Sequence, residues 1–104
     1  MDKWLLVVES NCKDETREAE LDQWYDNVHI PDILSGSPGF KRAAQYLIKR
    51  PQAGKGKYLT VYEIETDDID ATIAAHGKNM KRLFTAGRNS ELVGMVSWSF
   101  SKIK

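Results

Sequence analysis

The segment FKRAAQYLIKRPQAGKGKYLTVYEI (Phe40–Ile64) decides the fold, because its pattern is that of two strands joined by a loop. In its first half, apolar side chains at every second position alternate with polar ones, as in a strand that packs one face on a core. The apolar members of this half are Phe40, Ala44, Tyr46 and Ile48. Alternation resumes after Arg50–Lys57, a stretch of glycine, proline and lysine that is typical of a loop. The centre of the chain therefore predicts a β-hairpin.

A helical pattern flanks this hairpin on each side, and an apolar strand pattern lies near each end of the chain. Asp14–His29 begins with acidic residues, as a helix N-terminus prefers. Thr66–Arg88 carries an apolar stripe at helical spacing and closes near Gly87, a suitable residue after a helix C-terminus. Trp4–Val8 and Leu92–Phe100 are the terminal strands. The order βαββαβ predicts an α+β, ferredoxin-like fold, with a four-stranded antiparallel sheet and two helices on one face.

The totals restrict the class of protein. A chain of 104 residues predicts a single domain, 1–104. Fifteen basic residues balance fifteen acidic ones, whereas nucleic-acid binders usually carry a basic excess, so we expect no nucleic-acid partner. The longest apolar run at the N-terminus is too short for a signal or a membrane span, and we expect a cytoplasmic protein without membrane contact.

Cofactor motifs are lacking in the sequence. Glycine-rich nucleotide loops and the H-E-x-x-H metal motif do not occur. The two histidines and the single cysteine do not have the spacing of a zinc site. We therefore expect an activity that needs no nucleotide cofactor and no metal.

The second face of the predicted sheet is also apolar, although it would meet water in a monomer. The residues that the alternation assigns to it are Leu5, Val7, Ala43, Leu47, Leu59, Val61, Val93 and Met95. The simplest cover is a second copy of the chain, packed sheet to sheet about a two-fold axis. We therefore expect a homodimer in which the two sheets form an α/β barrel.

The first helix carries a possible acid–base group near its end. Pro31 disfavours helical geometry at the residue before it, so the helix should end or kink there. His29 would then lie in the last turn, where the helix dipole favours imidazolium. Tyr25, four residues earlier, and Asp26, three residues earlier, could both touch it. The pattern is compatible with general acid–base chemistry, or with a capping histidine stabilised by Asp26 or by the last carbonyls.

The second helix carries the other histidine, His76, near the middle of the apolar stripe that includes Met80 and Phe84. A stripe of this kind faces the sheet, so the imidazole should point inward. The functional interpretation is a second proton site in a cleft between helices and sheet. The alternative is a core histidine hydrogen-bonded to a tyrosine or a backbone carbonyl.

Aromatic side chains could line such a cleft, although aromatics on strands are often ordinary core. The residues that we expect to contact a small hydrophobic or aromatic substrate are Trp24, Tyr46, Tyr62, Met80, Phe84 and Trp98.

The pattern Trp24-Tyr25-x-x-Val28-His29-x-Pro31, followed by Pro38-Gly39-Phe40 and an alternating strand, resembles the EthD-like branch of the dimeric α/β-barrel superfamily. The resemblance implies a ferredoxin-like monomer that dimerises through its sheets. Relatives in this superfamily include cofactor-independent monooxygenases, polyketide cyclases, lactone isomerases, dehydratases and haem-binding or haem-degrading proteins. His29 matches the motif histidine, whereas His76 resembles a later histidine of some cyclases only by its location.

The favoured hypothesis is a cofactor-independent enzyme acting on a small, hydrophobic, aromatic or polyketide-like carbonyl compound. His29 would be the general acid or base, Tyr25 its partner or an oxyanion donor, and Asp26 would tune the imidazole. His76 would supply a second proton site. The reaction could be that of a lyase or dehydratase, an isomerase, a cyclase or a monooxygenase. The alternatives are a non-catalytic dimer that binds a small molecule or haem, with His76 as axial ligand, and a purely structural dimer.

Overall fold

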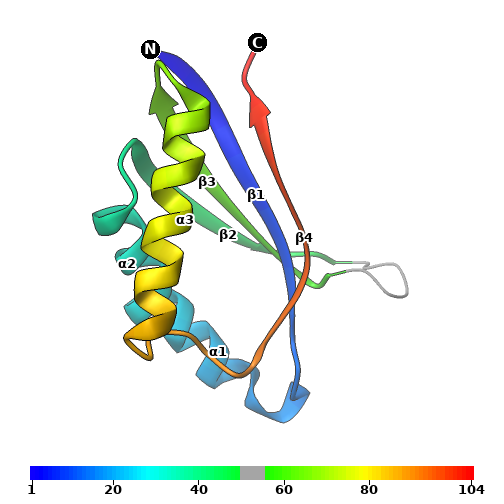
Figure 1. Ribbon diagram of the computed structural model, residues 1–104. Coiled ribbons are helices and arrows are strands. Elements are labelled where there is room, and N and C mark those ends of the chain that lie inside the picture. The colour runs from blue at the N-terminus through cyan, green and yellow to red at the C-terminus, as the bar shows by residue number, and fades with distance from the viewer. Residues whose placement is uncertain (50–55) are drawn as a thin grey trace.

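The computed structural model describes residues 1–49 and 56–104, so most of the predicted loop Arg50–Lys57 lies outside the described residues. Four antiparallel strands form one sheet in the order β2-β3-β1-β4, and the helices cover one of its faces (Figure 1). The elements are β1 (Asp2–Cys12), α1 (Glu18–Trp24), α2 (Ile30–Gly36), β2 (Phe40–Leu47), β3 (Tyr58–Thr66), α3 (Ile69–Thr85) and β4 (Val93–Lys102). The predicted ferredoxin-like monomer is therefore confirmed. Within the described ranges, no helix is long and apolar enough to cross a membrane.

The first helical region runs further than the sequence predicts. It starts with a 3₁₀ turn (Glu15–Arg17), continues as α1, passes through a π-helical turn (Tyr25–His29) and resumes as α2. In the π turn the Ile30 N–H donates to the carbonyl of Tyr25, five residues back. Of the two outcomes expected at Pro31, an end or a kink, the end is wrong, and a π turn interrupts the regular α-helix directly before this part of the chain. Pro31 follows the π turn as the second residue of α2.

The core lies between the helices and the sheet in two groups of buried side chains. The larger group consists of Leu6, Ile33, Phe40, Tyr62, Ile64 and Leu83. The smaller one consists of Leu21, Tyr25, Tyr58 and Leu92. Both groups draw on the helices and the strands, so the same contacts that bury apolar area also fix how the helices lie over the sheet.

Two irregularities in the strand pairing change which side chains face the helices. The register of β2 against β3 shifts between Phe40 and Arg42, and that of β1 against β4 shifts between Glu9 and Ser10. Because side chains alternate with a period of two, one extra residue moves every later side chain to the other face. The face assignments beyond each shift are therefore the reverse of those that simple alternation predicts.

The corrections concern β2 and β4. Ala43 pairs with Tyr62 and Leu47 with Tyr58, both on the helix side, so neither belongs to the far face as predicted. Tyr46 pairs with Leu59 on the far side and is 56% exposed. Val93 and Met95 lie on the helix side, where they line the cavity described below.

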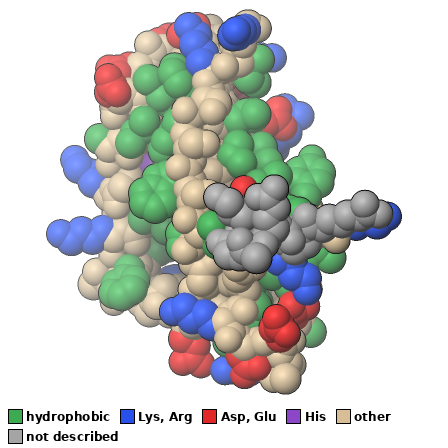
Figure 2. Space-filling model, turned by 90° about the vertical axis from the view of Figure 1, so that its right-hand side faces the viewer, with side chains coloured by type: hydrophobic (Ala, Val, Ile, Leu, Met, Phe, Trp, Pro, Cys, Tyr) green, Lys and Arg blue, Asp and Glu red, His purple; other side chains and the backbone are tan. Residues whose placement is uncertain are grey.

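The far face nevertheless remains rich in apolar residues. Its apolar members are Leu5, Val7, Ala44, Tyr46, Leu59 and Val61. Figure 2, which views the molecule from the right-hand side of Figure 1, shows hydrophobic side chains on both sides of a central band of backbone and other side chains. Near one end of this face, Arg42 pairs with Glu63 at 3.3 Å. The far face is therefore mainly apolar, with polar groups among its apolar rows.

Two glycines differ in backbone conformation, so their replacement by alanine should change stability in opposite directions. Gly39, before β2, has a positive φ of 87°, and a Cβ there would lie 3.0 Å from the Glu65 carbonyl oxygen. Gly77 lies inside α3, and a Cβ there would meet nothing within 4 Å. We expect Gly39→Ala to lower the free energy of unfolding by about 1–2 kcal/mol, and Gly77→Ala to raise it by roughly 0.5–1 kcal/mol. Urea denaturation measures both, and equal shifts in one direction would contradict this backbone geometry.

Candidate functional site

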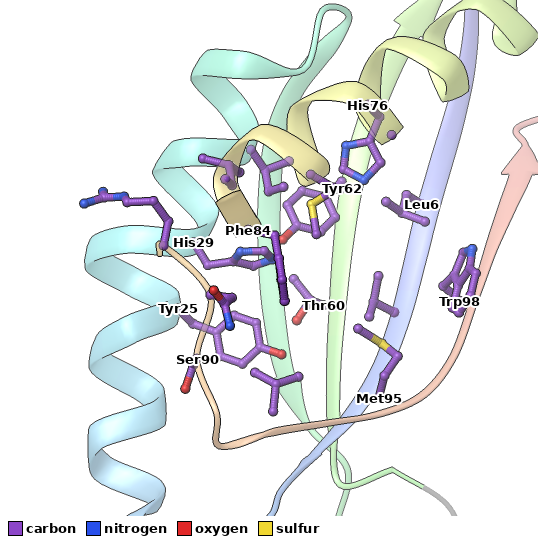
Figure 3. Close-up of a pocket in the computed structure, with 18 of the residues that line it drawn as sticks. Leu6, Tyr25, His29, Thr60, Tyr62, His76, Phe84, Ser90, Met95 and Trp98 are labelled. Carbon is purple, nitrogen blue, oxygen red and sulfur yellow. The ribbon is translucent and has the colours of Figure 1, made fainter. Parts of the chain in front are cut away.

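A cavity of about 710 Å³ lies between the helices and the sheet, and its walls are mainly apolar (Figure 3). The π turn and α3 form one side, the sheet forms the floor, and residues of the 86–92 connection close one end. Phe84 on α3 and Trp98 on β4 line the cavity although each is about two-thirds exposed, so they form its rim. The predicted site residues that line it are Trp24, Tyr25, His29, Tyr62, His76, Met80, Phe84 and Trp98.

The π turn explains the position of His29. On an α-helix, residues five apart point about 140° away from one another. The five-residue hydrogen bond of the π turn brings them to one side, and the His29 ring stacks on Trp24 with centroids 4.4 Å apart. Tyr25 meets the same ring edge-on at 5.8 Å. The two aromatic neighbours hold the imidazole against the cavity.

His29 is neutral at neutral pH. Its pKa is lowered from the ordinary value of 6.5 to about 4, mainly by burial; Asp32 acts to raise the pKa, and a positive charge on His76 acts to lower it. The expectation that the helix dipole favours imidazolium is therefore wrong, because the helix continues past His29 and the ring is half-buried. Within residues 1–49 and 56–104, neither ring nitrogen of His29 has a hydrogen-bond partner.

Two residues of the predicted site lie outside the cavity. Tyr46 points to the far face of the sheet because of the shift in β2. Asp26 is exposed and does not line the cavity, because the π turn directs His29 toward Trp24 instead. The carboxylate that acts on His29 is Asp32, one turn further along.

Asp32 is neutralised by Arg88, which the sequence analysis did not single out. Two guanidinium nitrogens of Arg88 donate to the two carboxylate oxygens at 2.9 and 3.1 Å. This pairing lowers the pKa of Asp32. The indole N–H of Trp24 donates to the Arg88 carbonyl at 2.9 Å, which ties the 86–92 connection to the first helix. The charged groups at this end of the cavity are therefore paired with each other.

His76 projects from α3 on the helical side of the cavity, and its ring stacks on Phe40 with centroids 4.7 Å apart. Its Nδ1 lies 2.8 Å from the Oγ of Ser37, rather than near a tyrosine or a backbone carbonyl. Burial lowers the pKa of His76 as well. Both imidazoles of the chain are therefore neutral and line one cavity, as Figure 3 shows.

A chain of side-chain hydrogen bonds extends from His76 away from the cavity. Asn79 Nδ2 donates to Ser37 Oγ at 3.0 Å and to the Asp32 carbonyl at 3.3 Å, and Arg82 donates to Asn79 Oδ1 at 2.7 Å. Gly36 makes room for this amide, since a Cβ there would lie 2.7 Å from Asn79 Cγ. The sequence does contain a signal for Asn79, because it lies three residues after His76 on the same helix and therefore near the same face.

The two tyrosines of the cavity differ in their hydrogen bonding. The Tyr25 hydroxyl shares a 2.8 Å hydrogen bond with Ser10 Oγ deep in the core. Tyr62 is only 3% exposed, yet its hydroxyl has no partner among the described residues. Burial raises the pKa of both phenols, so both remain protonated. Tyr62, rather than Tyr25, therefore has a hydroxyl available to a ligand.

Several cavity residues could not be recognised from the sequence. Those from the sheet are Leu6, Val8, Thr60, Val93 and Met95. Those from the 86–92 connection are Arg88, Asn89 and Ser90. In the part of the chain that the structure describes, no three His, Cys, Asp or Glu side chains group closely enough to hold a metal ion.

Comparison with known proteins defines the fold. No family model matches the chain, and no curated protein matches it. Solved structures do match, and they have the ferredoxin-like fold of the dimeric α/β-barrel proteins. The resemblance noted in the sequence is thus confirmed at the level of the fold.

Three of these structures show how similar the matching proteins are to this chain in sequence and in fold. HapK from Hahella chejuensis is 14% identical with a TM-score of 0.72, over 97% of this chain and 92% of its own. An EthD family protein from Bacillus halodurans is 16% identical with a TM-score of 0.57, over the full length of both chains. The haem degrader MhuD from Mycobacterium tuberculosis, solved with two haems in its active site, is 19% identical with a TM-score of 0.63, over 96% and 94%.

The low pKa of His29 predicts how stability depends on pH. Between about pH 6.5 and 4 the unfolded chain binds a proton at this residue and the folded chain does not, so the free energy of unfolding falls as the pH falls through this window. His29→Gln should weaken that dependence; the remainder comes from His76 and, at the acid end of the window, from carboxyls with a lowered pKa such as that of Asp32. Urea denaturation at several pH values measures the slope, and an NMR titration of the imidazole gives its pKa directly. Titration of His29 near its ordinary pKa would contradict the burial argument.

Proposed function

We propose that this protein is a cofactor-independent enzyme that uses acid–base chemistry on a small, apolar, aromatic or polyketide-like carbonyl compound. The observation that carries the proposal is the pairing of an apolar cavity with uncommitted polar groups. The His29 ring and the Tyr62 hydroxyl lack partners among the described residues, and both line that cavity. Neither group is sealed off without a partner, because unpartnered polar atoms of the described residues all remain accessible. Accessible polar groups in the wall of a large apolar pocket favour a ligand that pairs with them.

The neutral state of His29 suits it to accept a proton. A carbon next to a ligand carbonyl would lose its proton to the imidazole, and the electron pair would move onto the carbonyl oxygen. The negative charge that develops there would raise the pKa of the nearby imidazole and so strengthen the base during the step. Tyr62, kept protonated by burial, would donate a hydrogen bond to the same oxygen.

The fate of the enolate decides the reaction type. In a dehydration the carbonyl re-forms as the β C–O bond breaks, and the His29 imidazolium returns its proton to the leaving hydroxide, giving water. In an isomerisation the proton returns to a different carbon. In a cyclisation the enolate carbon attacks a second carbonyl of the same molecule, and the alkoxide that forms takes the proton from the His29 imidazolium. A monooxygenase would need a ligand whose carbanion is stable enough to react with dioxygen. The same acid–base group serves each of these reactions.

A second candidate function is the binding of haem or another small molecule without turnover. Two imidazoles on the wall of a 710 Å³ apolar cavity favour it, since histidine is a common axial ligand of haem. The iron would supply the binding of diatomic gases or electron transfer, and the histidine would hold it.

We also propose that the protein is a homodimer assembled through the far faces of its sheets. The apolar rows of Val7, Leu59 and Val61 lie in the two central strands and are only half-buried in the single chain. Packing these residues against the same face of a second copy would remove their apolar surface from water, and the two copies would be related by a two-fold axis. The cavity lies on the opposite side of the sheet, so each protomer would keep its own.

The enzyme proposal is tested by ligand screening and turnover. Wild-type protein, His29→Ala and the control Asp26→Asn are screened by thermal shift against aromatic polyketides, hydroxy-ketones, lactones and haemin. A ligand at 100 times its dissociation constant should stabilise the wild type by about 2.7 kcal/mol. We expect an aromatic carbonyl compound to be bound and converted by the wild type and the control. Conversion by His29→Ala should fall by roughly 10²–10⁴-fold, the usual contribution of a general acid or base.

Other outcomes of the screen decide between the two functions. Stabilisation by haemin alone, with a Soret band that shifts in a histidine variant, would replace the enzyme by the haem-binding candidate. Unchanged turnover in His29→Ala would exclude His29 as the acid–base group.

The dimer is tested by placing a charge at its proposed centre. Val61→Lys should give a monomer, because an unpaired ammonium cannot be buried between two apolar sheets. The matched control is Ala74→Lys on the exposed side of α3, which should leave the dimer intact. Analytical ultracentrifugation gives the mass, and circular dichroism checks the fold. Sedimentation of the wild type as a monomer would contradict the proposal.

A further inference from the structure

The hydrogen-bond chain behind His76 determines which of its ring nitrogens carries the proton. The orientation of the Asn79 amide is the starting point. Arg82 can only donate, so the atom of Asn79 that it contacts must be the carbonyl oxygen. The backbone carbonyl of Asp32 can only accept, so the atom facing it must be the NH₂ group. The same NH₂ group faces Ser37 Oγ at 3.0 Å and therefore donates to it.

The Ser37 hydroxyl therefore accepts a hydrogen bond from Asn79, and its own hydrogen must be donated elsewhere. Ser37 is 2% exposed, so water does not reach this hydroxyl freely, and a buried donor without a partner is costly. Over residues 1–49 and 56–104, the Ser37 hydroxyl has one further polar neighbour, Nδ1 of His76 at 2.8 Å. The hydroxyl must donate to this nitrogen, and Nδ1 must accept.

We infer that His76 is held as the neutral Nε2–H tautomer, so that it presents a fixed N–H donor to the cavity and selects ligands with an oxygen acceptor at that point. The suitable oxygen is that of a ketone, a quinone or a phenolate. Ser37 and Asn79 are positioning residues for this donor, since neither lines the cavity. The role toward a ligand rests on the proposed function, whereas the tautomer itself does not.

The two histidines would therefore have different roles toward a ligand. His29 has free ring nitrogens and can take up a proton, whereas Nδ1 of His76 is already engaged and its Nε2 is a donor. The general base is therefore His29, and His76 assists Tyr62 at the ligand oxygen. The tautomer of His76 also bears on haem binding. An axial histidine needs a free lone pair on the ring nitrogen that binds iron, and it usually donates a hydrogen bond from the other ring nitrogen. His76 has the opposite arrangement, so an axial ligand would have to be His29.

The tautomer can be observed directly in the ligand-free protein. A long-range ¹H–¹⁵N correlation spectrum at neutral pH separates a protonated ring nitrogen from an unprotonated one. For His76 we expect Nε2 at the protonated position and Nδ1 at the unprotonated position. The reverse assignment, or an averaged signal for both nitrogens, would overturn the inference without the need for any variant.

Replacing the side-chain amide of Asn79 by a carboxylate should reverse the tautomer of His76. In N79D the carboxylate can only accept, so Ser37 would donate to it and would accept from Nδ1–H of His76. The Nε2 resonance should then move to the unprotonated position. The matched control N27D makes the same chemical change at an exposed site away from the cavity and should leave His76 unaltered. Removal of the hydroxyl in S37A should give a mixture of tautomers, and an unchanged Nε2–H form in both N79D and S37A would overturn the inference.

The role of the donor is tested with fluorenone and fluorene, two planar aromatic molecules that differ in one ketone. Fluorenone should shift the His76 Nε2–H signals, and fluorene should shift them much less while bound in the same cavity. Binding of fluorenone without a shift at Nε2 would overturn the selecting role of His76. Failure of both molecules and of the whole screening library to bind would instead contradict the proposed function, with the tautomer in the free protein unaffected.

Discussion

The one extra residue in the first helix is the constraint on which the site depends. The π turn from Tyr25 to His29 places Trp24 and His29 on one side of the helix, and their stacked rings form one end of the cavity. In a regular α-helix the same two side chains would diverge by about 140°. The turn also carries the chain into α2, and Ser37, the residue after α2, contacts the second histidine. The position of His29 thus depends on this departure from regular helix, and so does that of Ser37, the hydrogen-bond partner of His76.

Single-residue irregularities also explain where sequence reasoning succeeds and where it fails. The order and type of the elements follow from hydrophobic periodicity, and the structure agrees with them from β1 to β4. Face assignments fail beyond each β-bulge, as for Tyr46 and Met95, because alternation has no means of counting an inserted residue. The predicted contact between Asp26 and His29 is wrong for a similar reason, because it assumed regular α-helical spacing and the π turn adds one residue.

Contacts between distant segments are the other part that the sequence does not show. His29 and His76 could be identified because each lies on an inward helical stripe, and so could Tyr62. The pairing of Arg88 with Asp32, or of Ser37 with His76, joins residues 56 and 39 positions apart and depends on how the helices pack. These contacts set the electrostatics of the site. Because Arg88 neutralises Asp32, burial outweighs the carboxylate at His29, and the imidazole stays neutral.

Apart from exposed Lys81, and Arg88 whose charge Asp32 balances, the cavity is lined by neutral groups, so new charge between the imidazoles would appear only with a reacting ligand. Neutral donors and acceptors cost less to bury than ions, and in a low-dielectric pocket they act strongly on charge that develops between them. The polar chain from Arg82 to His76 has a second consequence, because it crosses the contact between α2 and α3. Gly36 is needed there for Asn79 to approach, so helix packing and the protonation pattern of His76 are determined by one contact. A change that separates the two helices would release the Ser37 hydroxyl and, with it, the orientation of the donor in the cavity.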